Sequence, residues 1–207
     1  MIYDLAIGDC GLAPLLLASS ILKARPGLRL AIFTRDAQPG GDCLELVLPE
    51  RLAPALQDLI EPIVVRSWPG YVLRRDGQMI ERAAPVWLLD PVQLQLELEL
   101  LTNPPSFVGA EALTSAREVI TLPAGPIRVR AAQIIGAEAL AGLTVPVLAD
   151  FDVASGEAAF LQYIPLGDER VAVCSVHASD DDGDDRSPEA ILSARWDMVA
   201  QIAESVA

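Results

Sequence analysis

The sequence predicts an α/β fold that begins with a parallel βαβ unit, and three segments near the N-terminus support this. Ile2 to Ile7 is a short apolar run, typical of a strand that is buried on both faces. Leu12 to Ala24 follows a glycine-containing turn and keeps apolar residues at helical spacing until Pro26-Gly27 ends it. Leu28 to Phe33 is a second apolar run and predicts the second strand. This order is Rossmann-like, because a helix between two parallel strands makes a right-handed crossover.

Helices and strands are also predicted in the middle of the chain. Pro49 to Ile60 has leucines at helical spacing and predicts a helix despite Pro54. Ile63 to Val65 and Gly70 to Leu73 predict strands, with the segment Trp68-Pro69-Gly70-Tyr71 between them. These elements continue the α/β pattern beyond the first unit.

The leucines from Gln93 to Leu100 alternate with polar residues, which by period alone indicates a strand. We predict a helix instead, because Asp90-Pro91 provides an N-cap and a first-turn proline, and Glu, Gln and Leu favour helix. Asn103-Pro104-Pro105 ends it. Additional mixed β-strands are predicted at Glu118–Thr121, Ile127–Arg130, Gln133–Ile135, Val147–Val153, Ala158–Ile164 and Arg170–Val176.

The C-terminal part predicts an acidic loop, Asp180 to Asp185, and then a helix that Ser187 caps and Pro188 begins. The apolar face of this helix includes Val199, Ile202 and Val206. With Gly183 at the sixth place of a calcium loop, Ala178 occupies the place that requires Asp. We therefore interpret the acidic run as a solvated loop.

Composition and charge exclude several classes of protein. The 207 residues are 52% hydrophobic and carry a net charge of −14, which opposes binding to nucleic acid or to an anionic membrane surface. No apolar run reaches the roughly 20 residues that span a bilayer, and acidic residues stand where a signal peptide is basic. Three cysteines without short spacing predict neither a disulfide framework nor a metal site. We expect a protein of the reducing cytoplasm, either free or peripheral to a membrane complex.

Several segments carry a family resemblance, and the most specific is the tetrad Trp68-Pro69-Gly70-Tyr71. The others are Tyr3–Ile7, Gly11–Ala13, Ala24–Arg29, Gly40-Gly41, Ile60–Val65, Val145–Asp150, Phe160–Leu166 and Asp168–Arg170. Together they resemble the amino-terminal half of the bacterial lycopene β-cyclases, flavoproteins of carotenoid synthesis. The resemblance implies a Rossmann-like part at residues 1–60 and 115–150 and substrate-domain-like strands and helices at 61–114 and 150–207. It implies FAD as the cofactor of the family.

The residues that would bind FAD in such a protein are mostly replaced. The G-x-G-x-x-G loop falls on Asp9 to Pro14 and retains only Gly11. Asp9 places a carboxylate where backbone amides should meet a pyrophosphate, and Pro14 replaces the third glycine. Thr34 stands at the acidic position that would bind the ribose.

Other family signatures are replaced as well. After Gly40-Gly41, the segment Asp42-Cys43-Leu44-Glu45 stands for Asn-His-Thr-Trp, and Gly136-Ala137-Glu138-Ala139 stands for Asp-Ala-Arg-Gly. The acidic pair with which the family handles protons falls on Cys174-Ser175. We therefore expect no catalytic residue and no bound cofactor. Gly11, Gly40 and Gly41 are the residual family positions.

The remaining candidate residues have structural interpretations. Cys174 and His177 suggest a nucleophile pair, but residues three apart on a strand point to opposite faces. Four arginines form a basic patch in the sequence of this acidic chain: Arg66, Arg74, Arg75 and Arg82. They are interpreted as strand-face arginines, with docking of an acidic partner as the alternative. The tryptophans are Trp68, Trp87 and Trp196. Core or half-buried roles are expected for them before roles as interface anchors.

Three functions remain open. The first is a non-catalytic subunit or scaffold that binds a protein partner or a second copy, which the mean hydropathy of +0.36 favours. Its candidate contact surfaces are the apolar face around Leu94, Leu98 and Leu101 and the apolar face of the terminal helix. The second is a flavin-dependent carotenoid cyclase that is completed by another chain. The third is a carrier of an apolar ligand such as a carotenoid.

Overall fold

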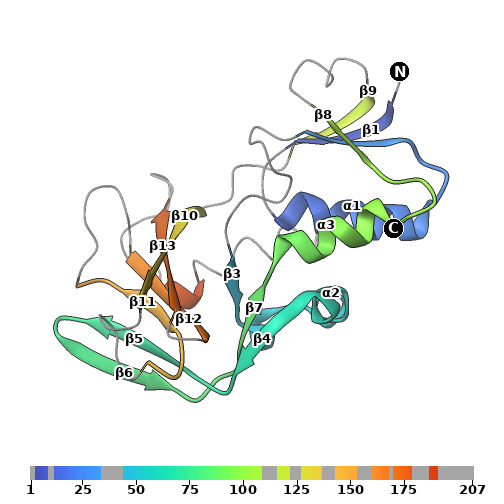
Figure 1. The fold of residues 1–207 in the computed structure, drawn as a ribbon. Coiled ribbons are helices and arrows are strands. Elements are labelled where there is room, and N and C mark those ends of the chain that lie inside the picture. Colours follow the sequence, from blue (N-terminus) through green and yellow to red (C-terminus); the bar gives the residue numbers. More distant parts are fainter. Residues whose placement is uncertain are drawn as a thin grey trace.

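The N-terminal βαβ unit builds a parallel four-stranded sheet. The computed structural model describes residues 3–8, 12–33, 44–108, 116–121, 127–136, 143–152, 160–167, 170–178 and 187–190. In it, β1 (Tyr3–Gly8) lies between β2 (Leu30–Phe33) and β9 (Ala116–Thr121), and β8 (Ser106–Val108) pairs with β2. Helix α1 (Leu12–Ala24) connects β1 to β2 (Figure 1). The predicted βαβ unit is confirmed.

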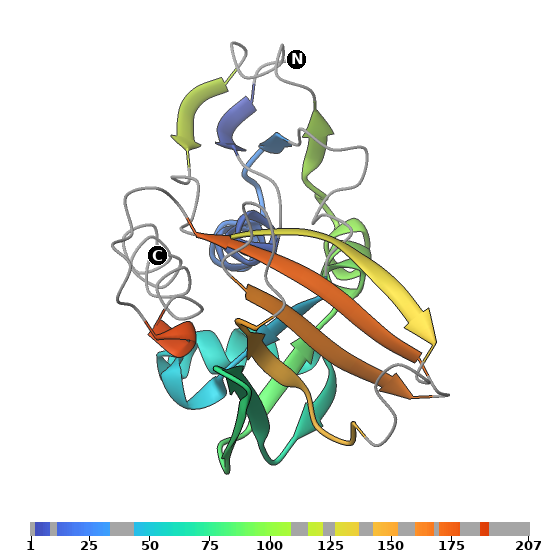
Figure 2. The same ribbon diagram turned by 90° about the vertical axis from the view of Figure 1, so that its left-hand side faces the viewer.

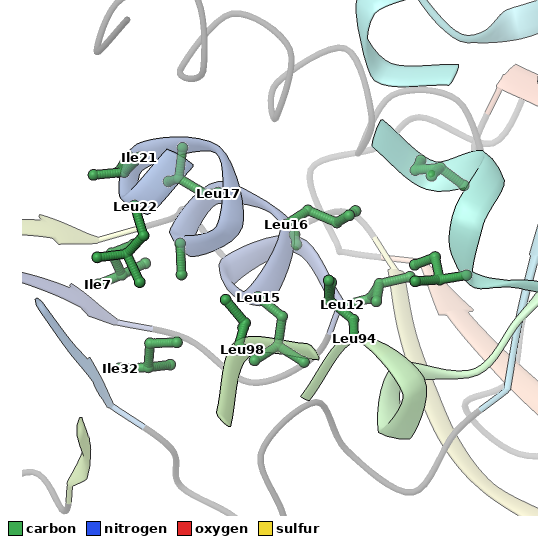
Figure 3. Close-up of a cluster of buried hydrophobic side chains, with 14 of the residues drawn as sticks. Ile7, Leu12, Leu15, Leu16, Leu17, Ile21, Leu22, Ile32, Leu94 and Leu98 are labelled. Carbon is green, nitrogen blue, oxygen red and sulfur yellow. The ribbon is translucent and has the colours of Figure 1, made fainter. Parts of the chain in front are cut away.

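Helix α1 is buried on every side. Ten of its thirteen residues are buried, and the only polar residue among them is Ser19. Figures 1 and 2 show α1 below the four-stranded sheet and beside α3 (Pro91–Glu99). In Figure 3, Leu12 and Leu15 lie near Leu94 and Leu98 of α3. A helix that is apolar all round is stable only where neighbours cover each face, so α1 forms the centre of the first core.

A small three-stranded sheet separates this core from a second one. Its strands are β3 (Glu45–Val47), β7 (Val86–Leu89) and β4 (Val64–Trp68). Side chains alternate along a strand, so Val47 and Leu89 enter the core around α1 while Leu46 and Leu88 enter the second core. The small sheet is therefore a wall that both cores share.

The second core lies against a six-stranded mixed sheet of order β10-β13-β12-β11-β5-β6. Its strands are β5 (Tyr71–Arg75), β6 (Gln78–Arg82), β10 (Ile127–Gly136), β11 (Val147–Asp150), β12 (Phe160–Gly167) and β13 (Arg170–Ala178). Figure 2 shows this sheet face on. A two-residue turn joins β5 to β6, with φ of 54° at Asp76 and 71° at Gly77. Asp-Gly suits such a turn, because both central residues need positive φ.

Three consecutive residues, the last of β11 and the two that follow it, contact the end of the β5–β6 hairpin. The buried carboxylate of Asp150 accepts a hydrogen bond from Arg74 at 3.1 Å. The Arg75 guanidinium lies over the Phe151 ring, 5.4 Å from its centroid. Asp152 accepts a hydrogen bond from the backbone N–H of Gly77 at 3.0 Å. These contacts connect β11 to the β5–β6 hairpin, which forms one end of the six-stranded sheet.

Most predicted elements are present, with changed limits. The predicted helix from 49 to 60 is divided into the 3-10 turn η1 (Pro49–Arg51) and α2 (Pro54–Ile60), and the turn η2 (Glu61–Ile63) follows. Pro54 lacks an N–H and so begins a new helix instead of continuing the old one. The two strands predicted at 127–130 and 133–135 are one strand, β10, with an irregular register between Arg130 and Gln133. Four strands that the sequence did not predict are β3, β6, β7 and β8.

Helix α3 confirms the predicted helix and its N-cap, since the Asp90 side chain accepts a hydrogen bond from the backbone N–H of Val92. The suggestion that its Leu94–Leu98 face contacts a partner is wrong. Both leucines are 1% exposed and pack in the core around α1, while Leu101 is partly buried against it. The three residues use the helix face that α1 already covers.

The start of the terminal helix also matches the prediction. Ser187 Oγ accepts a hydrogen bond from the backbone N–H of Ala190, which is an N-cap contact. Val199, Ile202, Val206 and the acidic run at 180–185 lie outside the described residues. Among the helices of the described part, none has the length and apolar character needed to cross a bilayer.

Replacing Gly70 by alanine is expected to lower the free energy of unfolding by about 1–3 kcal/mol. A Cβ at Gly70 would lie 2.6 Å from the backbone oxygen of Arg82, so β6 would have to move. Gly27→Ala is the matched control, because a Cβ there meets nothing within 4 Å. The control should leave stability unchanged or raise it by about 0.4–1 kcal/mol. Urea unfolding of both variants tests this, and equal losses would contradict it.

Asp4 is expected to titrate at a pKa of about 2, because Arg29 donates to its carboxylate through both side chain and backbone. A pKa lowered in the folded state adds stability above the unfolded pKa near 4, and this stability disappears as the pH falls towards 2. NMR titration of the side-chain carboxyl measures the pKa directly. In Arg29→Met it should rise towards 3.8, and an unchanged value would contradict the assignment.

Arg74→Met is expected to lower the free energy of unfolding by about 1–3 kcal/mol, because it leaves a buried carboxylate without its charged donor. The Asp150 side chain is only 1% exposed. Arg75→Met is the control, since the Arg75 side chain is 70% exposed and lies over a ring instead of a buried charge. Thermal unfolding compares the two. A larger loss for Arg75→Met would show that Asp150 does not depend on Arg74.

Candidate functional site

The carboxyl edge of the four-stranded sheet is the place where a fold of this kind binds a ligand. β1 pairs with a parallel strand on each side. Gly8, at its carboxyl end, lies opposite Phe33 of β2 and Thr121 of β9. Open parallel sheets bind ligands outside the carboxyl ends of strands at such a switch point. The first turn of α1 begins after Gly8 and would face a bound pyrophosphate. The candidate site is therefore the N-terminus of α1.

The first turn of α1 is apolar and lacks one backbone donor. It consists of Leu12, Ala13 and Pro14, all buried, with exposed fractions of 0% for Leu12 and 2% for Ala13. The first N–H groups of a helix have no partner within it and are those that bind an anion. Pro14, third in the helix, has no N–H and so removes one of them. For the same reason the helix tolerates a proline there.

Two nearby sequence positions add no positive charge for a pyrophosphate. Asp9, directly after β1, contributes a carboxylate, and Thr34, directly after β2, has no charge. Two like charges about 4 Å apart repel by roughly 1–4 kcal/mol between water-like and surface-like screening. The donor set thus fits a dinucleotide pyrophosphate poorly. Asp9, Thr34 and the residual positions Gly11, Gly40 and Gly41 lie outside the described residues.

The position at which the sequence resemblance places an acidic pair is occupied by a core residue. Cys174 on β13 is 0% exposed and belongs to the second core. His177 lies on the same strand, where it stands opposite Arg128 of β10. Both residues are in regular strand, the arrangement in which residues three apart face opposite sides. Cys174 contributes packing in this environment.

The four arginines considered for docking of an acidic partner are Arg66, Arg74, Arg75 and Arg82, and those of the β5–β6 hairpin do not share one face. Arg74 shares a sheet face with Val72, whereas Arg75 and Arg82 alternate to the opposite face of the hairpin. Arg66 donates to the backbone oxygen of Pro165 and lies 5.9 Å from the centre of the Trp68 ring. The interpretation as strand-face arginines agrees with this arrangement.

Two tyrosine hydroxyls lie in the region of the six-stranded sheet. Tyr71, from the Trp-Pro-Gly-Tyr tetrad, donates to Glu189 Oε1 at 3.0 Å and so connects β5 to the start of the terminal helix. Burial and the Glu189 carboxylate raise the pKa of Tyr71. Burial, followed by the Asp150 carboxylate, raises the pKa of Tyr163. Both hydroxyls therefore stay protonated and act as donors.

The sequence interpretation missed Asp150 as a buried charge. The only signal available was an acidic residue at the end of the apolar run Val145 to Ala149. Trp68 lies in the second core and Trp87 is partly buried against the first, as expected of structural tryptophans. Trp196 is outside the described residues. Within the described part, no cluster of three or more potential metal ligands exists.

Comparison with known proteins identifies the fold. The p-nitrophenol 4-monooxygenase of Pseudomonas putida matches with a TM-score of 0.52 and 13% identity, covering 87% of this chain and 59% of that one. A variant of 2-methyl-3-hydroxypyridine-5-carboxylic acid oxygenase matches with a TM-score of 0.50 and 11% identity, covering 99% and 68%. A probable FAD-dependent monooxygenase of Pseudomonas aeruginosa reaches 0.49 at 12% identity, covering 86% and 61%.

These likenesses concern the fold alone. The chain spans 59% of the length of the Pseudomonas putida monooxygenase. No family model and no curated protein matches the sequence. The predicted fold class is confirmed: this is an α/β chain with a parallel sheet and additional mixed strands, a fold that it shares with the p-nitrophenol 4-monooxygenase and the pyridine-carboxylic acid oxygenase.

Proposed function

We propose that the chain is a degenerate relative of the lycopene cyclase-like flavoproteins, and that it acts as a non-catalytic subunit of a protein assembly. The observation that carries the proposal is the first turn of α1. Leu12, Ala13 and Pro14 are buried there, and Pro14 has no N–H to donate. A chain that used FAD in the family manner would need these donors at the carboxyl end of β1.

The sequence supports the same proposal at three further positions. Asp9 and Thr34 replace a glycine and the acidic ribose ligand, and the acidic pair expected for proton transfer falls on Cys174-Ser175. Cys174 is buried in a packed core, so this position supplies no acid. The framework residues, by contrast, still build the fold. Loss of the chemical groups with retention of the framework favours a structural role over a catalytic one.

The purified protein is expected to be colourless and to show no saturable binding of FAD in a calorimetric titration. The reason is the apolar first turn of α1 together with the carboxylate of Asp9. Absorbance of a native preparation distinguishes the three functions considered. Flavin bands at near-stoichiometric level would overturn the proposal, and carotenoid bands would favour a carrier of apolar ligands.

The assembly itself needs a separate measurement. Sedimentation of the native complex, with its partner identified by mass spectrometry, should show the chain in a species heavier than the monomer. A monomer in native extract and in purified form, with no partner retained, would contradict the subunit role even if no flavin is bound.

A further inference from the structure

Helix α3 carries a second apolar face that the core does not use. Val92, Leu96 and Leu100 are 44%, 49% and 86% exposed. They repeat every four residues and so form one line on the helix surface. We refer to these three residues as the α3 stripe. Leu94 and Leu98 fill the core from the other side of the helix, so the α3 stripe is not required to hold α3 in the fold.

The two charged residues of α3 itself are both negative. Glu97 and Glu99 are exposed and lie in the last turn, and α3 has no basic residue there. The carboxyl end of a helix already carries partial negative charge, so two glutamates at this end are electrostatically unfavourable. A cation placed beside them would interact favourably with both carboxylates and with the helix end. Gln95 donates to Glu99 at 2.9 Å, a neutral contact that leaves this negative charge in place.

This pattern determines which kind of partner fits. A second copy of the chain would bring a net charge of −14 and another pair of α3 glutamates, and strong like charge keeps proteins apart. An amphipathic helix with apolar residues every three or four positions and Lys or Arg beside them complements both the stripe and its rim. Its apolar side chains would cover Leu96 and Leu100, and its cations would face Glu97 and Glu99.

We propose that the α3 stripe is the docking surface for a basic amphipathic helix of a partner protein. This inference rests on the proposed role as a subunit and adds the surface and the chemistry of the partner. Docking buries the three exposed apolar side chains, and the cations of the partner helix neutralise the glutamates at the end of α3.

The test uses the full-length chain and two fluorescent synthetic peptides. One is an amphipathic helix of leucine and lysine, and the other has glutamate in place of every lysine. Fluorescence anisotropy should show saturable binding of the lysine peptide and none of the glutamate peptide. Leu96→Glu should weaken binding of the lysine peptide at least about tenfold, because it places a charge in the apolar contact.

The matched control is Met79→Glu, on β6 outside α3, where the methionine is 61% exposed. Both substitutions add one negative charge, so unspecific attraction of a basic peptide would increase in both variants. Only docking on the α3 stripe predicts a loss for Leu96→Glu and unchanged or stronger binding for Met79→Glu. Circular dichroism checks folding, and Leu100→Glu at the helix end serves as the second variant if Leu96→Glu unfolds.

Three outcomes would overturn the inference. Equal or stronger binding of the lysine peptide by both α3 variants would show that the peptide does not use the stripe. A dimer of the unmodified chain in sedimentation equilibrium, dissociated by Leu96→Glu, would show that a second copy occupies it. A native complex that survives Leu96→Glu would also remove this surface, but it would leave the proposed subunit role standing.

Discussion

The burial of α1 is the constraint on which the remaining structure depends. Its leucines face the four-stranded sheet, α3 and the region of α2 at once, so each of these elements is positioned by contact with one helix. Such a helix has no polar face to present to water, and only complete coverage makes it stable. The coverage extends to Leu12 in the first turn. The same packing that holds the fold thus makes the candidate site at the start of α1 apolar.

The three-stranded sheet packs against both cores and so connects α1 and its neighbours to the six-stranded sheet. Val47 and Leu46 are neighbours in sequence, yet they belong to different cores because successive residues of a strand point to opposite faces. Close backbone approach at Gly70 and the hydrogen bond from Tyr71 to Glu189 join this region to the hairpin and to the start of the terminal helix. The tetrad Trp68-Pro69-Gly70-Tyr71 therefore has a structural role in this chain, which does not require a cofactor.

The proposed loss of chemical groups, with the framework retained, has a simple physical basis. Residues such as Ile7 and Leu94 are held by packing, and replacing them would leave cavities or strain. Residues that only contact a cofactor have no such restraint once the cofactor is not used. Pro14 illustrates this, because the third position of a helix has no internal hydrogen bond to lose. The exposed α3 stripe is the surface on which we propose that a partner docks.

The sequence by itself determined the elements that are specified by residues close together in the chain. The apolar period of Leu12–Ala24, the N-cap at Asp90 and the cap at Ser187 each depend on residues a few positions apart. It missed β3, β7 and β8, which have three or four residues each, and it overlooked the Asp76-Gly77 signal for β6. Only the tertiary structure decided which of the two apolar faces of α3 enters the core, since both repeat at helical spacing. It also decided that Asp150 is a buried charge, because its partner Arg74 is 76 positions away in the chain. Pairing and burial depend on contacts between distant segments, and no local pattern specifies those contacts.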